Sequence, residues 1–154
     1  MDNKILIEQS QHWEKSFSSK PEMFGSEPSH SAKIALENFK KNNVKHIIEL
    51  GAGLGRDTIF FAKNSIKVTA LDYSPTAVEI IKNKSNSLGL GDLIEVQTHD
   101  LRQKLNFKDN SFDGCYSHML YCMAFTYSEL ENLNTEVCRV CLLYTSPSPR
   151  DKHR

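Results

Sequence analysis

Three glycines alternate with other residues directly after a short apolar segment and a glutamate. The residues are Glu49, Gly51, Gly53 and Gly55. The apolar run before them predicts a buried strand, and the apolar pattern that begins at Thr58 predicts a helix, so the glycines lie at a strand-to-helix junction. Backbone N–H groups at a helix N-terminus lack partners within the helix, and glycine lets a ligand approach without a Cβ in the way. The junction therefore predicts a ligand-binding turn.

The spacing of these glycines separates two classes of cofactor. The third glycine follows the second by two residues here, whereas the dinucleotide fingerprint places it three residues later. This spacing disfavours a nicotinamide dinucleotide. A nicotinamide- or other nucleotide-binding oxidoreductase with the same strand–helix–strand beginning is the alternative hypothesis.

An acidic residue ends the next strand. Strands over 44–50 and 66–71, with a helix over 57–63 between them, predict a parallel βαβ unit whose second strand ends at Asp72. An acid at this place can accept two hydrogen bonds from a ribose diol, and Tyr73 can pack against an adenine. We therefore expect Asp72 to bind a nucleoside.

The remaining pattern predicts further alternation of helices and strands. Apolar residues at helical spacing predict helices from about 29 to 41, from 77 to 88 and after 128. Short apolar runs bounded by turn residues predict strands over 93–97 and 112–117. Ligands in open parallel sheets bind outside the carboxyl ends of the strands. The candidate residues at the ends of the third and fourth strands are Asp100, Leu101, Ser117, His118 and Met119.

The heptad Glu49–Gly55 resembles the first motif of class I S-adenosylmethionine-dependent methyltransferases, and residues 56–62 resemble the thiopurine- and tellurite-type subset. The resemblance implies an α/β fold with a Rossmann-like class I methyltransferase sheet, of which the 3-2-1-4 half is encoded, and helices on both faces. It implies S-adenosylmethionine as the cofactor, with Asp72 on the ribose, Asp100 on the adenine amino group, the Leu101 N–H on the ring, and Ser117 beside the sulfonium. The cofactor-binding residues so expected are Glu49, Gly51, Gly53, Gly55, Asp72, Tyr73, Asp100, Leu101 and Ser117.

The methyl acceptor is not identified by the sequence, and we expect a small molecule. By the same resemblance Trp13, Phe24 and Ser29 lie over the methyl donor; the alternative is that these aromatic residues only anchor the N-terminal segment. Methyl transfer from a sulfonium requires no protonation of the leaving group, so no catalytic residue is assigned. If the acceptor must lose a proton, His118 is the first candidate base and Tyr121 the second, although a histidine at a strand end is more often structural.

Composition narrows the class of protein. The 154 residues fit one domain, and 19 basic and 19 acidic side chains give no net charge, so nucleic-acid binding gains no electrostatic support. No apolar run reaches the about 18 to 20 residues of a membrane span or resembles a signal peptide, which predicts a cytoplasmic protein that does not bind membranes. The four cysteines predict no disulfide framework, and the lone pair Cys138 and Cys141 predicts no metal site. The oligomeric state is not predicted.

The end of the chain departs from the pattern before it. Residues 141–154 resemble a translated transposon-end adapter, and two prolines stop any helix there; a genuine disordered tail is the alternative. We therefore predict an N-terminal lid segment over 1–30, a partial methyltransferase core over 31–140 and a non-native tail over 141–154. Such a fragment would leave its fourth strand as a bare edge, and it is expected to bind cofactor without full activity.

Overall fold

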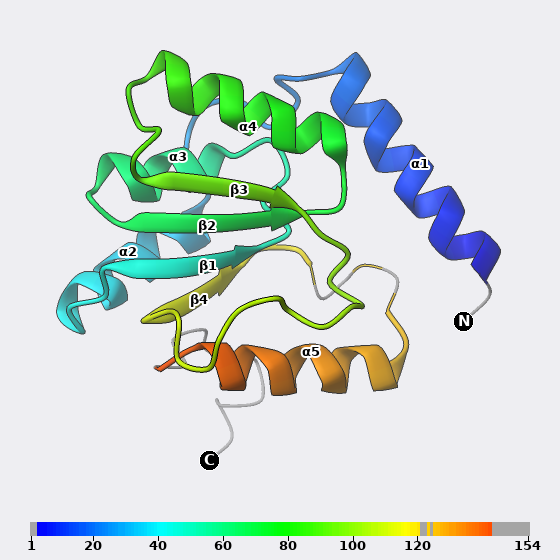
Figure 1. The fold of residues 1–154 in the computed structure, drawn as a ribbon. Coiled ribbons are helices and arrows are strands. Elements are labelled where there is room, and N and C mark those ends of the chain that lie inside the picture. Colours follow the sequence, from blue (N-terminus) through cyan, green and yellow to red (C-terminus); the bar gives the residue numbers. More distant parts are fainter. Residues whose placement is uncertain (1–2, 121–122, 124, 143–154) are drawn as a thin grey trace.

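The chain folds around a parallel four-stranded sheet in the computed structural model, which describes residues 3–120, 123 and 125–142. The strands are β1 (His46–Leu50), β2 (Lys67–Asp72), β3 (Ile94–Thr98) and β4 (Gly114–Ser117), in the order β3-β2-β1-β4 (Figure 1). Every neighbouring pair is parallel. The predicted α/β fold and the 3-2-1-4 order are confirmed, and the strand bounds differ from the expected ones by a few residues.

Helices cover both faces of this sheet. Successive residues of a strand point to opposite faces, and Ile47 packs with the buried residues of α2 (His30–Lys41), α3 (Arg56–Lys63) and α4 (Pro75–Ser87). Ile48 instead packs with the buried face of α5 (Tyr127–Val140), on the opposite side of the sheet (Figure 1). The strand ends, rather than the covered faces, are therefore where a ligand can reach the sheet.

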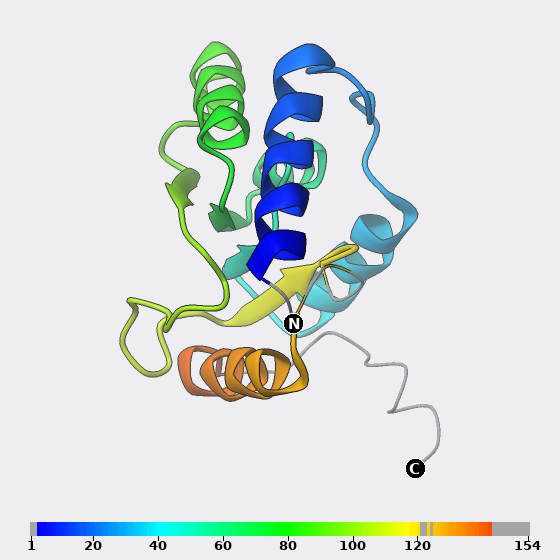
Figure 2. The same ribbon diagram turned by 90° about the vertical axis from the view of Figure 1, so that its right-hand side faces the viewer.

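The N-terminal segment contains a helix that the sequence analysis did not predict. Helix α1 (Asn3–Ser19) runs beside α4, as both views show (Figures 1 and 2). Its apolar side chains Trp13 and Phe17 pack with Leu54 of the glycine turn and with Ala77 of α4. The residues of the expected lid segment thus form a helix of their own and a following loop.

The chain after α5 returns to the edge of the sheet near the start of β4. Phe112 and Cys141 form an isolated parallel bridge, in which the Phe112 N–H donates to the Val140 carbonyl over 3.0 Å and the Leu142 N–H donates to the Phe112 carbonyl over 2.8 Å. The Cys141 side chain is buried together with Ile48 and the buried residues of α5. The expected tail therefore begins within a packed segment, and its residues 143–154 lie outside the described part of the chain.

Within the described residues, no helix has both the length and the apolar character that crossing a bilayer requires.

Candidate functional site: a cavity at the carboxyl ends of the strands

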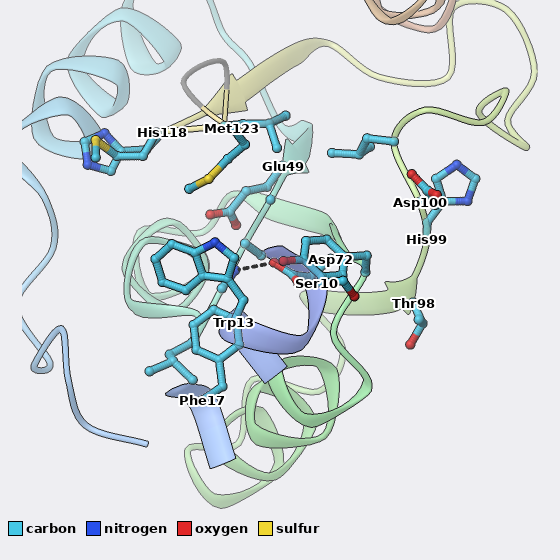
Figure 3. A pocket seen from close by; sticks show the side chains of 18 of the residues that line it. Ser10, Trp13, Phe17, Glu49, Asp72, Thr98, His99, Asp100, His118 and Met123 are labelled. Carbon is cyan, nitrogen blue, oxygen red and sulfur yellow. Dashed lines mark hydrogen bonds between the residues drawn. The ribbon is translucent and has the colours of Figure 1, made fainter. Parts of the chain in front are cut away.

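A cavity of about 610 Å³ lies where the carboxyl ends of the strands meet helix α1 (Figure 3). Its walls come from the glycine turn after β1, the residues that follow β2 and β3, the segment after β4, and one side of α1. Parallel strands place all of their carboxyl ends at one edge, which is why residues far apart in sequence meet here. Seven of the nine expected cofactor-binding residues line the cavity: Glu49, Gly51, Gly53, Asp72, Tyr73, Asp100 and Leu101.

The glycine turn approaches the cavity with its backbone, but its glycine N–H groups are already used within the fold. The Gly51 N–H donates to the Leu71 carbonyl over 2.8 Å, and the Gly55 N–H donates to the Ala52 carbonyl over 3.1 Å. The Gly53 N–H donates to Asp72 Oδ2 over 2.8 Å. These three N–H groups are therefore taken by β2, by Asp72 and by the turn itself, and the glycines contribute space for a ligand rather than these donors. At Gly51 and Gly53 the turn offers a ligand backbone without side chains, next to Ala52 and Leu54.

Gly55 does not line the cavity, and a different feature of the structure requires a glycine at this position. It is the N-cap of α3 in the left-handed conformation, with φ of 81°. A Cβ on this residue would lie 2.7 Å from Ile81 Cγ1, closer than real contacts allow. The third glycine of the motif therefore lets α3 begin against α4, and the structure gives it a packing role.

Asp72 lies between the glycine turn and the start of α4. Oδ1 accepts the Ser74 N–H over 2.9 Å, while the side chain of Ser74 caps α4 by accepting the Ala77 N–H over 3.1 Å. Asp72 is thus not the helix cap. Burial raises the pKa of its carboxyl, and the backbone donors of Ser74 and Gly53 oppose this rise. The carboxylate is held in a fixed orientation at the cavity wall.

Asp100 is paired with an arginine that the sequence analysis did not single out. Its carboxylate accepts from Arg102 Nε over 2.9 Å, from Arg102 Nη2 over 2.6 Å and from the Arg102 N–H over 3.0 Å. These hydrogen bonds lower the pKa of Asp100. Leu101 between them is buried. The acid at the end of β3 is therefore charged and lies beside a cation at the cavity.

Glu49 is the most deeply buried acid of the cavity wall. It accepts a hydrogen bond from Thr58 Oγ1 over 2.5 Å. Burial raises the pKa of Glu49 to about 8, and the neighbouring charges of Asp57 and Asp72 add to this rise. At neutral pH the carboxyl is therefore mostly protonated, and it can give up that proton when a cation approaches.

At the end of β4 the structure places two of the three candidate residues, His118 and Met119, at the cavity. Ser117 does not line it, and its Oγ donates to the Leu50 carbonyl over 3.2 Å. Leu120, which follows His118 and Met119 and was not a candidate, lines the cavity as well. Figure 3 places His118 at the opposite end of the cavity from Asp100. Tyr121, the second candidate base, lies outside the described residues.

Helix α1 supplies a wall that sequence reasoning only partly foresaw. Trp13 lines the cavity as expected, and Gln9, Ser10 and Phe17 line it as well. The Glu14 carboxylate accepts hydrogen bonds from the side chains of Ser74 and Thr76, which ties α1 to the start of α4. The signal was present: positions 9, 13 and 17 follow helical spacing, and no glycine or proline interrupts residues 3–19.

Phe24 lines the cavity, whereas Ser29 lies behind its wall and bonds to Asp57.

In the described part of the chain no group of three or more His, Cys, Asp or Glu side chains could hold a metal ion. Cys138 is exposed and Cys141 is buried, so the two thiols lie in different environments.

The chain is similar to proteins of known family. A family model described as a methyltransferase domain matches residues 47–142. A sterol 4-C-methyltransferase from Caenorhabditis elegans is 27% identical over 95 residues, which cover 62% of this chain and 27% of that protein. This chain therefore spans about a quarter of the length of that relative.

Solved structures show the same fold. A structure determined for the conversion of a disulfide bond into a thioacetal group during echinomycin biosynthesis has a TM-score of 0.64 at 27% identity, covering 75% of this chain and 46% of that one. A geranyl diphosphate methyltransferase in complex with SAM has a TM-score of 0.64 at 14% identity, covering 73% of this chain and 42% of that one. At that identity the second likeness concerns the fold alone.

Proposed function

This chain belongs to the methyltransferase domain family, and from that membership we propose that it binds S-adenosylmethionine in the cavity and takes part in transfer of the methyl group to an acceptor. The observation that carries the proposal is the position of Asp72. Asp72 ends β2, and its carboxylate bonds to the glycine turn after β1 and lines the cavity, which is where a nucleoside-binding fold holds a ribose.

Different residues of the cavity wall are proposed to bind the ribose, the adenine and the amino-acid end of this cofactor. Asp72 is proposed to bind the ribose hydroxyls, Tyr73 to pack beside the adenine, and Asp100 with Leu101 to bind the adenine edge. Glu49 lies beside the glycine turn and is proposed to face the positively charged amino-acid end. Ser117 does not line the cavity and its hydroxyl is turned to Leu50, so the place near the sulfonium is proposed for His118 and Met119, which follow it and line the cavity.

Positioning is the chemistry that the chain's own residues supply. When bound, the cofactor supplies a methyl group carried on a sulfonium sulfur. Once the methyl group has gone to the acceptor, the leaving group is a neutral thioether, which needs no proton. The chain must therefore hold donor and acceptor in line and exclude water, and the aromatic side chains Trp13, Phe17 and Phe24 form a wall able to do this. His118 is the proposed base only for an acceptor that must lose a proton.

Finer assignments are also proposals. Membership of the thiopurine- and tellurite-type subset is supported by residues 56–62 and by the cavity-lining positions of Trp13 and Phe24. A small-molecule acceptor is supported by the similarity to a sterol 4-C-methyltransferase. A larger parent enzyme is supported by the shares of the relatives that the chain covers. Within it we propose a lid over 1–30, a partial core over 31–140 and a tail over 141–154, whose first two residues pack at the start of β4.

Calorimetry with S-adenosylhomocysteine, the demethylated product, tests the cofactor assignment, and NADH tests the oxidoreductase alternative in parallel. We expect S-adenosylhomocysteine to bind and NADH to give no heat above dilution. Binding of NADH without binding of S-adenosylhomocysteine would overturn the proposal. A methylation assay with a panel of small acceptors then separates cofactor binding from turnover.

A further inference from the structure

The loop over residues 20–29, between α1 and α2, is fastened to the first turn of α3 by two consecutive side chains. Arg56 holds the middle of the loop: its Nη1 donates to the Phe24 carbonyl over 3.4 Å, and its guanidinium lies 5.6 Å from the centre of the Phe24 ring. Asp57 holds the end of the loop through Ser29. Its Oδ1 accepts the Ser29 N–H over 2.8 Å, and its Oδ2 accepts from Ser29 Oγ over 2.7 Å.

The same carboxylate reaches a third segment. The Tyr116 hydroxyl, on β4, donates to Asp57 Oδ2 over 2.8 Å. Burial raises the pKa of Tyr116, so the phenol stays a neutral donor. Ser29 Oγ in turn accepts the Ala32 N–H over 3.1 Å and caps α2. Asp57 thus joins the loop, α3 and β4 in one buried hydrogen-bond network.

The Asp57 side chain does not cap its own helix. An acid in the first turn often bonds to the free N–H groups of its own helix. Here the N-cap is Gly55, which makes no side-chain bond, and both Asp57 oxygens are directed to Ser29 and Tyr116. Arg56 and Asp57 follow Gly55 directly, so the loop is attached to the residues that continue the glycine turn into α3.

We propose that Arg56 and Asp57 are positioning residues that hold the 20–29 loop against the glycine turn, so that the Phe24 side of the cavity is set by the turn that contacts the cofactor. The identity of that cofactor rests on the proposed function. The attachment of the loop is a property of the unliganded chain and is tested without any ligand.

The first experiment measures loop attachment in the free protein. Asp57→Asn replaces an acceptor oxygen by a donor that opposes Ser29 or Tyr116, and we expect amide exchange at Ser29 and chymotrypsin cleavage after Phe24 to become about tenfold faster. Arg56→Ala is expected to speed cleavage after Phe24 while leaving exchange at Ser29 near the wild-type rate. Arg56→Lys, which keeps a cation near the ring, should retain most of the protection.

Thr69→Val is the matched control for a buried polar loss. The Thr69 hydroxyl, within β2, pairs with His46 Nε2 over 2.9 Å at the amino end of β1, and valine keeps the shape of threonine. This variant is expected to lose stability without faster exchange or cleavage in the loop. If the Asp57→Asn protein does not fold, the Arg56 pair still decides the outcome. Wild-type loop protection in both Arg56→Ala and Asp57→Asn, or equal loosening in Thr69→Val, overturns the inference.

A second measurement separates this inference from the proposed function. We expect Arg56→Ala and Asp57→Asn to bind S-adenosylhomocysteine about three- to tenfold more weakly than the wild type, with Thr69→Val unchanged. If the wild-type chain does not bind S-adenosylhomocysteine at all, the cofactor assignment fails, and the loop measurements alone decide the role of Arg56 and Asp57. Binding by the wild type with unaltered affinity in a loosened-loop variant would show that the loop does not shape the cofactor site.

Discussion

The Gly53 N–H donates to Asp72 Oδ2 over 2.8 Å, and this hydrogen bond joins the turn after β1 to the end of β2. The two residues belong to neighbouring strands whose pairing brings Leu50 opposite Leu71. The bond fixes the orientation of a buried carboxylate at the cavity wall, with the Ser74 N–H on its other oxygen. Because the carboxylate is already oriented, little side-chain entropy is lost when it accepts hydrogen bonds from a nucleoside.

Asp72→Ala should therefore weaken binding of S-adenosylhomocysteine by about 1 to 3 kcal/mol, or about 5- to 150-fold in Kd. The substitution removes the ribose acceptor and also leaves the Gly53 and Ser74 N–H groups without their partner. Calorimetry measures the affinity, and circular dichroism checks that the chain is folded. Asp92→Ala, at an exposed position before β3, is the control and should bind as the wild type does. An unchanged Kd for Asp72→Ala would refute the ribose assignment.

Gly55→Ala should destabilise the chain by about 2 to 4 kcal/mol in urea unfolding. Two effects add here: the left-handed φ of 81° and a Cβ that would lie 2.7 Å from Ile81 Cγ1. Gly89→Ala separates them, because Gly89 also has a positive φ, of 68°, but has nothing within 4 Å of its would-be Cβ. That control is expected to cost only about 1 kcal/mol. Equal losses in the two variants would show that α3 and α4 are not in close contact at Gly55.

The buried carboxyl of Glu49 should make stability fall as pH rises. Burial raises its pKa to about 8 from 4.5, so between these values the folded chain keeps a proton that the unfolded chain releases. Its contribution is fully present below pH 4.5 and is lost as pH rises through about 8, on the order of 2 to 4 kcal/mol. Glu49→Gln, which cannot ionise, should flatten this part of the profile in urea unfolding. Glu79→Gln, on the exposed side of α4, should leave it as it is.

How far the sequence predicts this site depends on whether a residue's position follows from the order and ends of the strands or from the orientation and packing of side chains. Gly53 and Asp72 could be placed at one edge because strand period and βαβ topology determine where strands end. The partners of Asp100 and Glu14 could not, since the orientation of Arg102 and the docking of α1 depend on tertiary packing. Ser117 was expected at the cavity from its place at a strand end, but its side chain turns to Leu50 and the chain continues into the cavity at His118.

Glu14 is expected to hold α1 over the cavity. Its carboxylate accepts hydrogen bonds from Ser74 and Thr76, and although burial opposes the effect, these bonds lower its pKa. Trp13 is the single tryptophan of the chain and lines the cavity beside this contact, so it reports on the position of the helix. Glu14→Ala should shift Trp13 emission to longer wavelength and increase its quenching by acrylamide, because the ring gains access to water.

The same contact predicts a dependence on pH in the wild-type chain. A lowered folded-state pKa gives stability that is present above 4.5 and is lost as pH falls through the folded value, so acid should reproduce the red shift of Glu14→Ala. Glu8→Ala, which removes only an exposed carboxylate paired with Lys4 one turn earlier on α1, is the control and should keep the wild-type emission at neutral pH. A Glu14→Ala protein with wild-type emission and quenching would mean that apolar packing of Trp13 and Phe17 on Leu54 is sufficient to dock α1.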